Sequence, residues 1–89
     1  MDRVLHTDID IKDTIHLMTS DDYKERFRAE LVQLDIRISK LSGMLSAWDT
    51  GDLGFTPTCP YDLLEAQLNA MKTYSYFLRA RAEIEGIVL

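Results

Sequence analysis

The sequence is poor in the residues that mark several specialised classes of protein. A single cysteine, Cys59, allows neither an internal disulfide nor a zinc site built on cysteine ligands. Only four glycines and two prolines occur in 89 residues, too few for a collagen-like or low-complexity chain. No apolar run approaches the ~18 residues that a membrane-spanning helix needs. We therefore expect one small soluble domain with no membrane partner.

Positive charge is also scarce, with 10 Lys and Arg side chains against 15 Asp and Glu and a formal net charge of -5. Sequence-independent binding to DNA or RNA depends on an excess of basic side chains, so we expect no nucleic-acid polymer as a partner. A local basic pocket in an acidic protein can still bind a small anion. The sequence has no basic start followed by an apolar segment, which, with the lone cysteine, predicts a cytoplasmic protein.

Patterns typical of metal sites and catalysis are missing as well. His6 and His16 are ten residues apart near Asp8, Asp10 and Asp13, whereas helical metal sites use ligand spacings of about three or four residues. The chain contains no glycine-rich phosphate loop and no Gly-x-Ser-x-Gly turn. No nucleophile, base and orienting group can be placed together. We predict a binding protein that is not an enzyme and uses neither a metal nor a cofactor.

A heptad pattern of apolar residues predicts a long amphipathic helix over residues 21–49. The pattern alternates steps of four and three and consists of Phe27, Leu31, Leu34, Ile38, Leu41, Leu45 and Trp48. Ser20 is expected to cap the helix, and Asp21 and Asp22 to oppose the positive end of its dipole. Gly51 is expected to take the left-handed conformation that ends helices.

A second helix is predicted after a connection over residues 50–59. Pro60 suits its first position, with Thr58 or Cys59 as the cap, and Gly86 suits its end. One apolar stripe of this helix holds Leu64, Leu68, Met71, Leu78 and Ala82, and another holds Leu63, Ala70, Phe77 and Ile84. The expected fold is all-α, a two-helix antiparallel hairpin over residues 20–89. Residues 1–19 form a separate N-terminal segment in which neither helix nor strand is favoured.

The two stripes of the second helix make an apolar face wider than one partner helix can cover. Val32, Ile36 and Met44 add apolar surface outside the stripe of the first helix. An isolated pair of helices in so short a chain is also weakly stabilised. We therefore predict a helical homo-oligomer in which Tyr74 and Tyr76 lie near helix–helix contacts.

Basic side chains gather on the first helix beside an aromatic ring. Tyr23, Lys24 and Arg26 occupy its first turns, and Arg37 and Lys40 are three residues apart and so share a face. An aromatic ring beside fixed positive charge is what a nucleotide requires, because the ring stacks on the base and the cations bind phosphate. The alternative is a solvated helical face whose cations pair with Glu25, Glu30 and Asp35.

Several short stretches resemble the hairpin domain of small bacteriophage anti-defence proteins over about residues 20–89. These stretches are Tyr23-Lys24-Glu25-Arg26-Phe27 with Leu34, Arg37, Lys40 and Leu41, then Phe55-Thr56-Pro57-Thr58-Cys59-Pro60, then Gln67, Ala70-Met71, Tyr74, Leu78 and Arg81-Ala82-Glu83-Ile84-Glu85-Gly86. The family includes an anti-CBASS protein that sequesters cyclic oligonucleotides. It also includes a longer anti-Thoeris relative that sequesters cyclic ADP-ribose-type signals.

The resemblance implies a sponge, a homo-oligomer such as a hexamer that captures a second messenger of the infected bacterial host without cleaving it. Family members bind cyclic dinucleotides in pockets shared between protomers, and some hold cyclic trinucleotides at separate sites. Carried over to this sequence, the aromatic role falls on Tyr23 and the phosphate-binding role on Arg37 or Lys40. Lys24 and Arg26 accompany Tyr23, and Arg81 is assigned to a second pocket.

Two other functions are compatible with the sequence. One is a sponge for cyclic ADP-ribose-type signals, and the other is a structural or adaptor subunit whose apolar faces dock on a different protein. Thermal stability in the presence of cyclic nucleotides separates the adaptor from the sponges, since only a bound ligand stabilises the fold.

Overall fold

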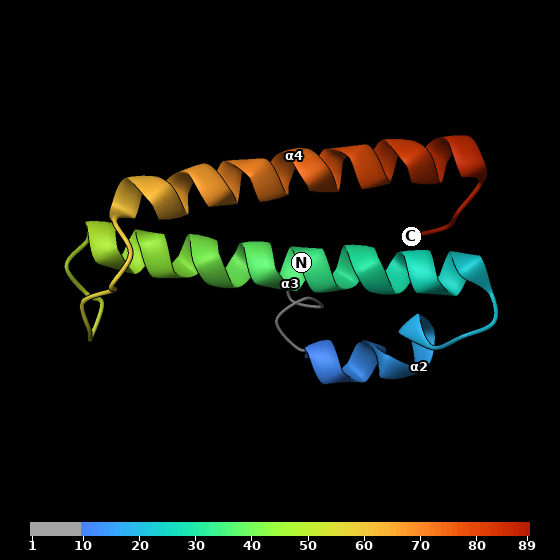
Figure 1. Cartoon of the computed structure of the whole chain (residues 1–89), viewed down its shortest axis with the longest axis horizontal. Helices are drawn as coiled ribbons and strands as arrows, with labels where there is room; N and C mark the ends of the chain where they lie inside the picture. The colour runs from blue at the N-terminus through green and yellow to red at the C-terminus, as the bar shows by residue number, and fades with distance from the viewer. Residues whose placement is uncertain (1–9) are drawn as a thin grey trace.

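The two long helices of the chain form an antiparallel hairpin (Figure 1). The structure, a computed structural model, describes residues 10–89. Helix α3 spans Tyr23–Asp49 and helix α4 spans Tyr61–Glu85, which confirms the two predicted helices and the all-α fold. The shorter helices η1 (Ile11–Thr14) and α2 (Ile15–Met18) pack against α3 on the side away from α4 (Figure 1).

Both long helices begin one or two residues later than the sequence suggested. Asp22 caps α3, because its Oδ1 accepts a hydrogen bond from the Lys24 amide at 2.9 Å. The expected cap, Ser20, instead accepts a hydrogen bond from the Asp22 amide at 3.0 Å. Pro60 is the cap residue of α4 rather than its first helical residue, and no side chain caps this end, so the prediction of Thr58 or Cys59 is wrong. Ser-Asp-Asp offers three capping side chains in a row, and the ring of proline fits either position.

The ends of both helices agree with the prediction. Gly51 follows α3 with a φ of 79°, and Gly86 caps α4 with a φ of 71°. Side chains with a Cβ rarely adopt this left-handed conformation, which explains the two glycines. The chain beyond Gly86 folds back, so that Ile87 is buried in the core and its amide donates to the Ala82 carbonyl at 2.9 Å.

The heptad stripe of α3 forms the core with the first stripe of α4, as predicted. Phe27, Leu31 and Leu34 form one buried cluster with Leu78 and Ala82. A polar contact crosses the hairpin near its middle and is described below. No helix within residues 10–89 has the length and apolar composition needed to cross a bilayer.

That polar contact joins three side chains, with Asp35 of α3 at its centre. Its Oδ1 accepts from the Ser75 hydroxyl at 3.2 Å, and its Oδ2 pairs with the Arg79 guanidinium at 2.6 Å. Ser75 is buried, and the Asp35 side chain is 13% exposed. A sliding of one helix along the other would leave these groups unpaired, so the contact favours a single register of the hairpin.

Residues 10–19 pack on the second face of α3. Thr14 is 2% exposed, and its Oγ1 accepts a hydrogen bond from Gln33 Nε2 at 2.7 Å. Ala29 and Ile36 lie on the same face of α3 as Gln33, and both are buried. Ile36 was expected to need another protomer. That expectation is wrong, because the N-terminal helices of the same chain cover this face.

The second apolar stripe of α4 stays open in the single chain. Leu63 is 58% exposed, Phe77 is 57% exposed and Ile84 is 84% exposed. Tyr74 and Tyr76 are exposed as well. The surplus apolar surface expected for α4 is therefore present. The homo-oligomer that would cover it stays a prediction.

Candidate ligand-binding site

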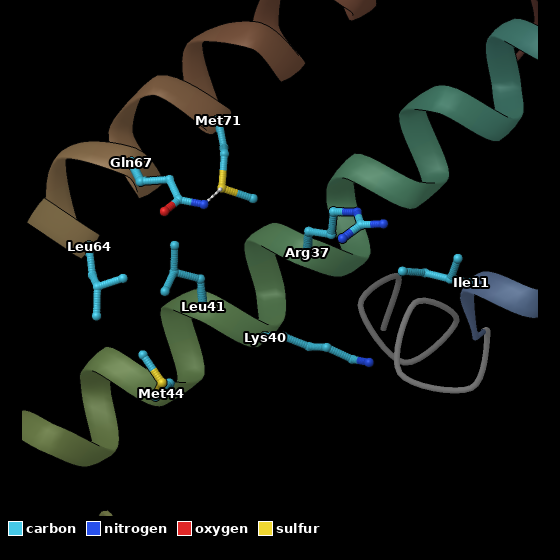
Figure 2. Close-up of a pocket in the computed structure, with 8 residues that line it drawn as sticks. All are labelled: Ile11, Arg37, Lys40, Leu41, Met44, Leu64, Gln67 and Met71. Carbon is cyan, nitrogen blue, oxygen red and sulfur yellow. Dashed lines mark hydrogen bonds between the residues drawn. The ribbon is translucent and has the colours of Figure 1, made fainter. Parts of the chain in front are cut away.

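A groove of about 400 Å³ lies along the middle of the hairpin. Figure 2 shows Arg37, Lys40 and Leu41 on α3, with Leu64, Gln67 and Met71 on α4. The remaining lining residues are Ile11 and Met44. The groove thus combines side chains from both long helices with one from η1.

Its two cations are available to a ligand. Arg37 and Lys40 are exposed, and within residues 10–89 neither has a hydrogen bond or an ion pair. Their spacing of three residues puts both on one face of α3, as the sequence predicted. Two fixed positive charges beside each other favour a phosphate or another anion.

The rest of the lining is mostly apolar and includes one amide. Leu41, Leu64 and Met71 provide the surface between the helices, and among residues 10–89 the Gln67 amide reaches only the Met71 sulfur, at 3.9 Å. A flat, partly apolar group can pack on such a surface, while the amide keeps hydrogen-bonding capacity for a polar edge. Charge on one side and an apolar surface on the other suit a ligand that has both an anionic part and a flat, partly apolar part.

The other predicted site residues lie at the far end of the hairpin. Tyr23 is 47% exposed at the start of α3. Lys24 Nζ donates to the Gly86 carbonyl at 3.4 Å, and Arg26 donates to the Ser20 carbonyl at 2.7 Å. Arg81 pairs with Glu85 at 3.0 Å, and its guanidinium lies 5.0 Å from the centre of the Phe27 ring. These cations already have partners, whereas the two in the groove have none in the described part of the chain.

The structure therefore separates the predicted residues into two groups. Tyr23 and Lys40 are 17 positions apart on one straight helix, which is roughly 25 Å at ~1.5 Å per residue. A cyclic dinucleotide cannot bridge that distance within one chain. Tyr23 and the groove cations can serve one ligand only if they come from different protomers.

Most lining residues of the groove were not assigned to a site from the sequence. Leu41, Leu64 and Met71 were predicted as core, and Gln67 carried no role. The available signal was the position of Leu41, four residues after Arg37, which puts the cations at the border of the apolar stripe. Nothing in the sequence pointed to Ile11, because its segment showed no clear periodicity.

In the part of the chain that the structure describes, no three His, Cys, Asp or Glu side chains gather to hold a metal ion; His6 and Asp8 lie outside it. At the loop end of the hairpin, the Tyr61 hydroxyl donates to Asp49 at 2.9 Å, and this hydrogen bond to a carboxylate raises the pKa of Tyr61. Trp48 packs edge-on against that ring, with 5.2 Å between centroids. This cluster holds the two helices together next to the connection.

Comparison with known proteins gives one match. The profile of the Sequestin family matches residues 21–84, which covers both long helices and the groove residues that they supply. No curated protein and no solved structure matches the chain. The name of the family denotes sequestration, which agrees with the sponge function that the resemblance implied. Since the match extends over more than half of its length, the chain belongs to the Sequestin family.

Proposed function

We propose that this protein is a phage anti-defence sponge that binds cyclic oligonucleotide second messengers and keeps them from the effectors of CBASS-type immunity. The observation that carries the proposal is the groove in which Arg37 and Lys40, which have no ion pair within residues 10–89, border an apolar surface inside the region matched by the Sequestin family. A sponge acts by holding its ligand, so no bond is made or broken. The site of action is the cytoplasm of the infected bacterium.

A nucleotide needs positive charge for its phosphate and an apolar surface for its base, and the groove has both. A cyclic dinucleotide carries two phosphates, which suit the guanidinium of Arg37 and the ammonium of Lys40. Its bases can pack over Leu41 and Met71, with the Gln67 amide at a base edge. Cyclic trinucleotides share this chemistry and are included in the proposal.

Assembly of several protomers is part of the proposal. The open stripe of α4 supplies a surface that a second copy can cover, and a hexamer is the arrangement that the resemblance implied. In such an assembly, Tyr23 of one protomer approaches the cations of another, which overcomes the separation seen in one chain. Each ligand would then be enclosed between subunits.

Thermal denaturation with a panel of cyclic nucleotides tests the proposal. A cyclic dinucleotide at about a hundred times its dissociation constant should stabilise the fold by about 2.7 kcal/mol. The ligand recovered after heating the complex should be chemically unchanged. Altered ligand would indicate an enzyme, stabilisation by cyclic ADP-ribose isomers alone would indicate an anti-Thoeris sponge, and no response to any nucleotide would favour the adaptor.

Replacing Tyr23 with alanine should weaken binding of a cyclic dinucleotide about tenfold, because stacking on an aromatic ring contributes roughly 1–3 kcal/mol per base. Tyr23→Phe keeps the ring and should bind like the wild type. Isothermal titration calorimetry measures both affinities, and gel filtration confirms that the assembly is intact. An unchanged affinity for Tyr23→Ala would show that this ring does not touch the ligand.

Placing a charge on the open stripe of α4 should break the assembly. Phe77 is 57% exposed in the single chain, and a glutamate there would be buried without a partner in an interface. Phe55→Glu is the matched control, since Phe55 is 60% exposed in the connection. Sedimentation velocity should show smaller particles for Phe77→Glu only. A wild-type protein that sediments as a single chain would contradict the shared pocket.

A further inference from the structure

The N-terminal helices lie outside the region matched by the Sequestin family, yet they reach the groove. The match begins at residue 21, whereas η1 and α2 end at Met18. Ile11 of η1 lines the groove together with Arg37 and Lys40 (Figure 2). This segment thus lies outside the matched region and still lines the groove through Ile11.

Local hydrogen bonds fix the first turn of η1. Asp10 and Asp13 form a reciprocal capping box, in which the Asp10 carboxylate accepts from the Ile11 amide at 2.7 Å and the Asp13 carboxylate accepts from the Asp10 amide at 2.9 Å. The Thr14 hydroxyl donates to the Ile11 carbonyl at 2.7 Å. The position of Ile11 is therefore set by hydrogen bonds on both sides of it.

Contacts with α3 then hold the segment in place. Thr14 is buried against the helix and accepts a hydrogen bond from Gln33, whose amide also lies 3.4 Å from the Met18 sulfur. Gln33 is one turn before Arg37 on α3. One face of α3 thus holds the N-terminal segment through Gln33 and, one turn later, carries the cations of the groove.

We propose that residues 10–19 are a specificity element of the groove, with Ile11 as a wall beside the two cations. This inference rests on the proposed function and adds a residue that selects among its ligands. An apolar side chain next to the exposed Arg37 and Lys40 shields one side of them from water, which strengthens the attraction of the cations for phosphate.

Discrimination between ligands follows from this position. A cyclic dinucleotide bound at the two cations should touch Ile11, while a cyclic trinucleotide, which the family resemblance assigns to a separate site, should not. Ile11→Ala removes the apolar contact, so it should weaken cyclic di-AMP binding about tenfold and leave cyclic tri-AMP binding unchanged. The ratio of the two dissociation constants is the quantity that reports the wall.

A charge at the same position gives a second test that does not depend on packing. Ile11→Glu would place a carboxylate beside the two cations, where it competes with phosphate, and should weaken cyclic di-AMP binding more than tenfold. Ile15→Glu is the matched control, because Ile15 is 52% exposed in the same segment and does not line the groove. Circular dichroism establishes that both variants keep their helices.

Titration calorimetry of these variants with cyclic di-AMP and cyclic tri-AMP decides the matter. Loss of affinity for Ile11→Glu with normal binding by Ile15→Glu supports the wall. Wild-type affinity and an unchanged ratio in both Ile11 variants would overturn it and leave the proposed sponge intact. If the wild-type protein binds neither nucleotide, the proposed function itself fails.

Discussion

Replacing both Arg37 and Lys40 with glutamate should reduce the affinity for a cyclic dinucleotide by a factor of a hundred or more. A hydrogen bond to a charged group contributes about 1.5–3 kcal/mol, and two such contacts would be lost together. Repulsion between the new carboxylates and the phosphates adds to the loss. Neither cation has a hydrogen bond or an ion pair within residues 10–89, so the substitutions break no polar contact of the described fold. Titration calorimetry with cyclic di-AMP measures the effect.

The controls for this prediction separate local contact from net charge. Lys72 is exposed on α4 and does not line the groove, so Lys72→Glu changes the net charge as much as Lys40→Glu but should leave binding within about twofold at physiological salt. Arg37→Lys keeps the charge and loses the planar donor pair, and should retain part of the affinity. Equal binding by the double variant and the wild type would show that the groove is not the site.

The long helices could be predicted from the sequence because their signal is repeated many times. The apolar side chains of α3 recur from Phe27 to Trp48, and each repeat places apolar residues on the same face of the helix. Gly51 and Gly86 mark the ends through a conformation that few other residues adopt. The starts were less certain, because Ser20 and Asp22 are both good caps; in the structure Asp22 accepts from the first turn of α3, and Ser20 accepts from the Asp22 amide.

The N-terminal helices were not predicted, for a physical reason. A helix of four residues, such as α2, is not stable by itself, and its sequence carries too few turns for a period to show. Its conformation depends on burying Thr14 and on the hydrogen bond with Gln33, which is distant in the sequence. The sequence alone therefore could not predict that the N-terminal helices cover Ile36. It could not predict that Ile11 lies beside the groove either.

The candidate site was predicted in part. The spacing of Arg37 and Lys40 predicted that they share a face, the family resemblance gave one of them the phosphate-binding role, and the structure places both on an open groove. The resemblance gave Tyr23 the aromatic role, but along α3 this residue is roughly 21 Å from Arg37 and about 25 Å from Lys40 at ~1.5 Å per residue. Distances between protomers cannot be deduced from one sequence, since they depend on which surfaces meet. The periodicity of α4 predicted one candidate surface for contact between protomers, the open stripe around Phe77.

Replacing Leu78 with alanine should produce the largest loss of stability. Leu78 is 1% exposed and belongs to the cluster that joins Phe27 and Leu31 of α3 to α4. Truncation of a buried leucine costs about 2.7–5 kcal/mol, through lost burial and the cavity left behind. Small domains have only about 5–15 kcal/mol in total, so much of the variant should unfold at moderate denaturant. Urea denaturation followed by circular dichroism measures the midpoint.

A conservative variant separates the effect of the cavity from the effect of any substitution at position 78. Leu78→Met keeps the volume and should cost less than about 1.5 kcal/mol. All proteins are compared at one concentration, because an oligomer is stabilised by mass action and its midpoint rises with concentration. If Leu78→Ala unfolds at the wild-type midpoint, the described packing of α4 on α3 is incorrect. The groove would lose its basis as well, because the packing of α4 on α3 is what holds Leu64, Gln67 and Met71 beside Arg37.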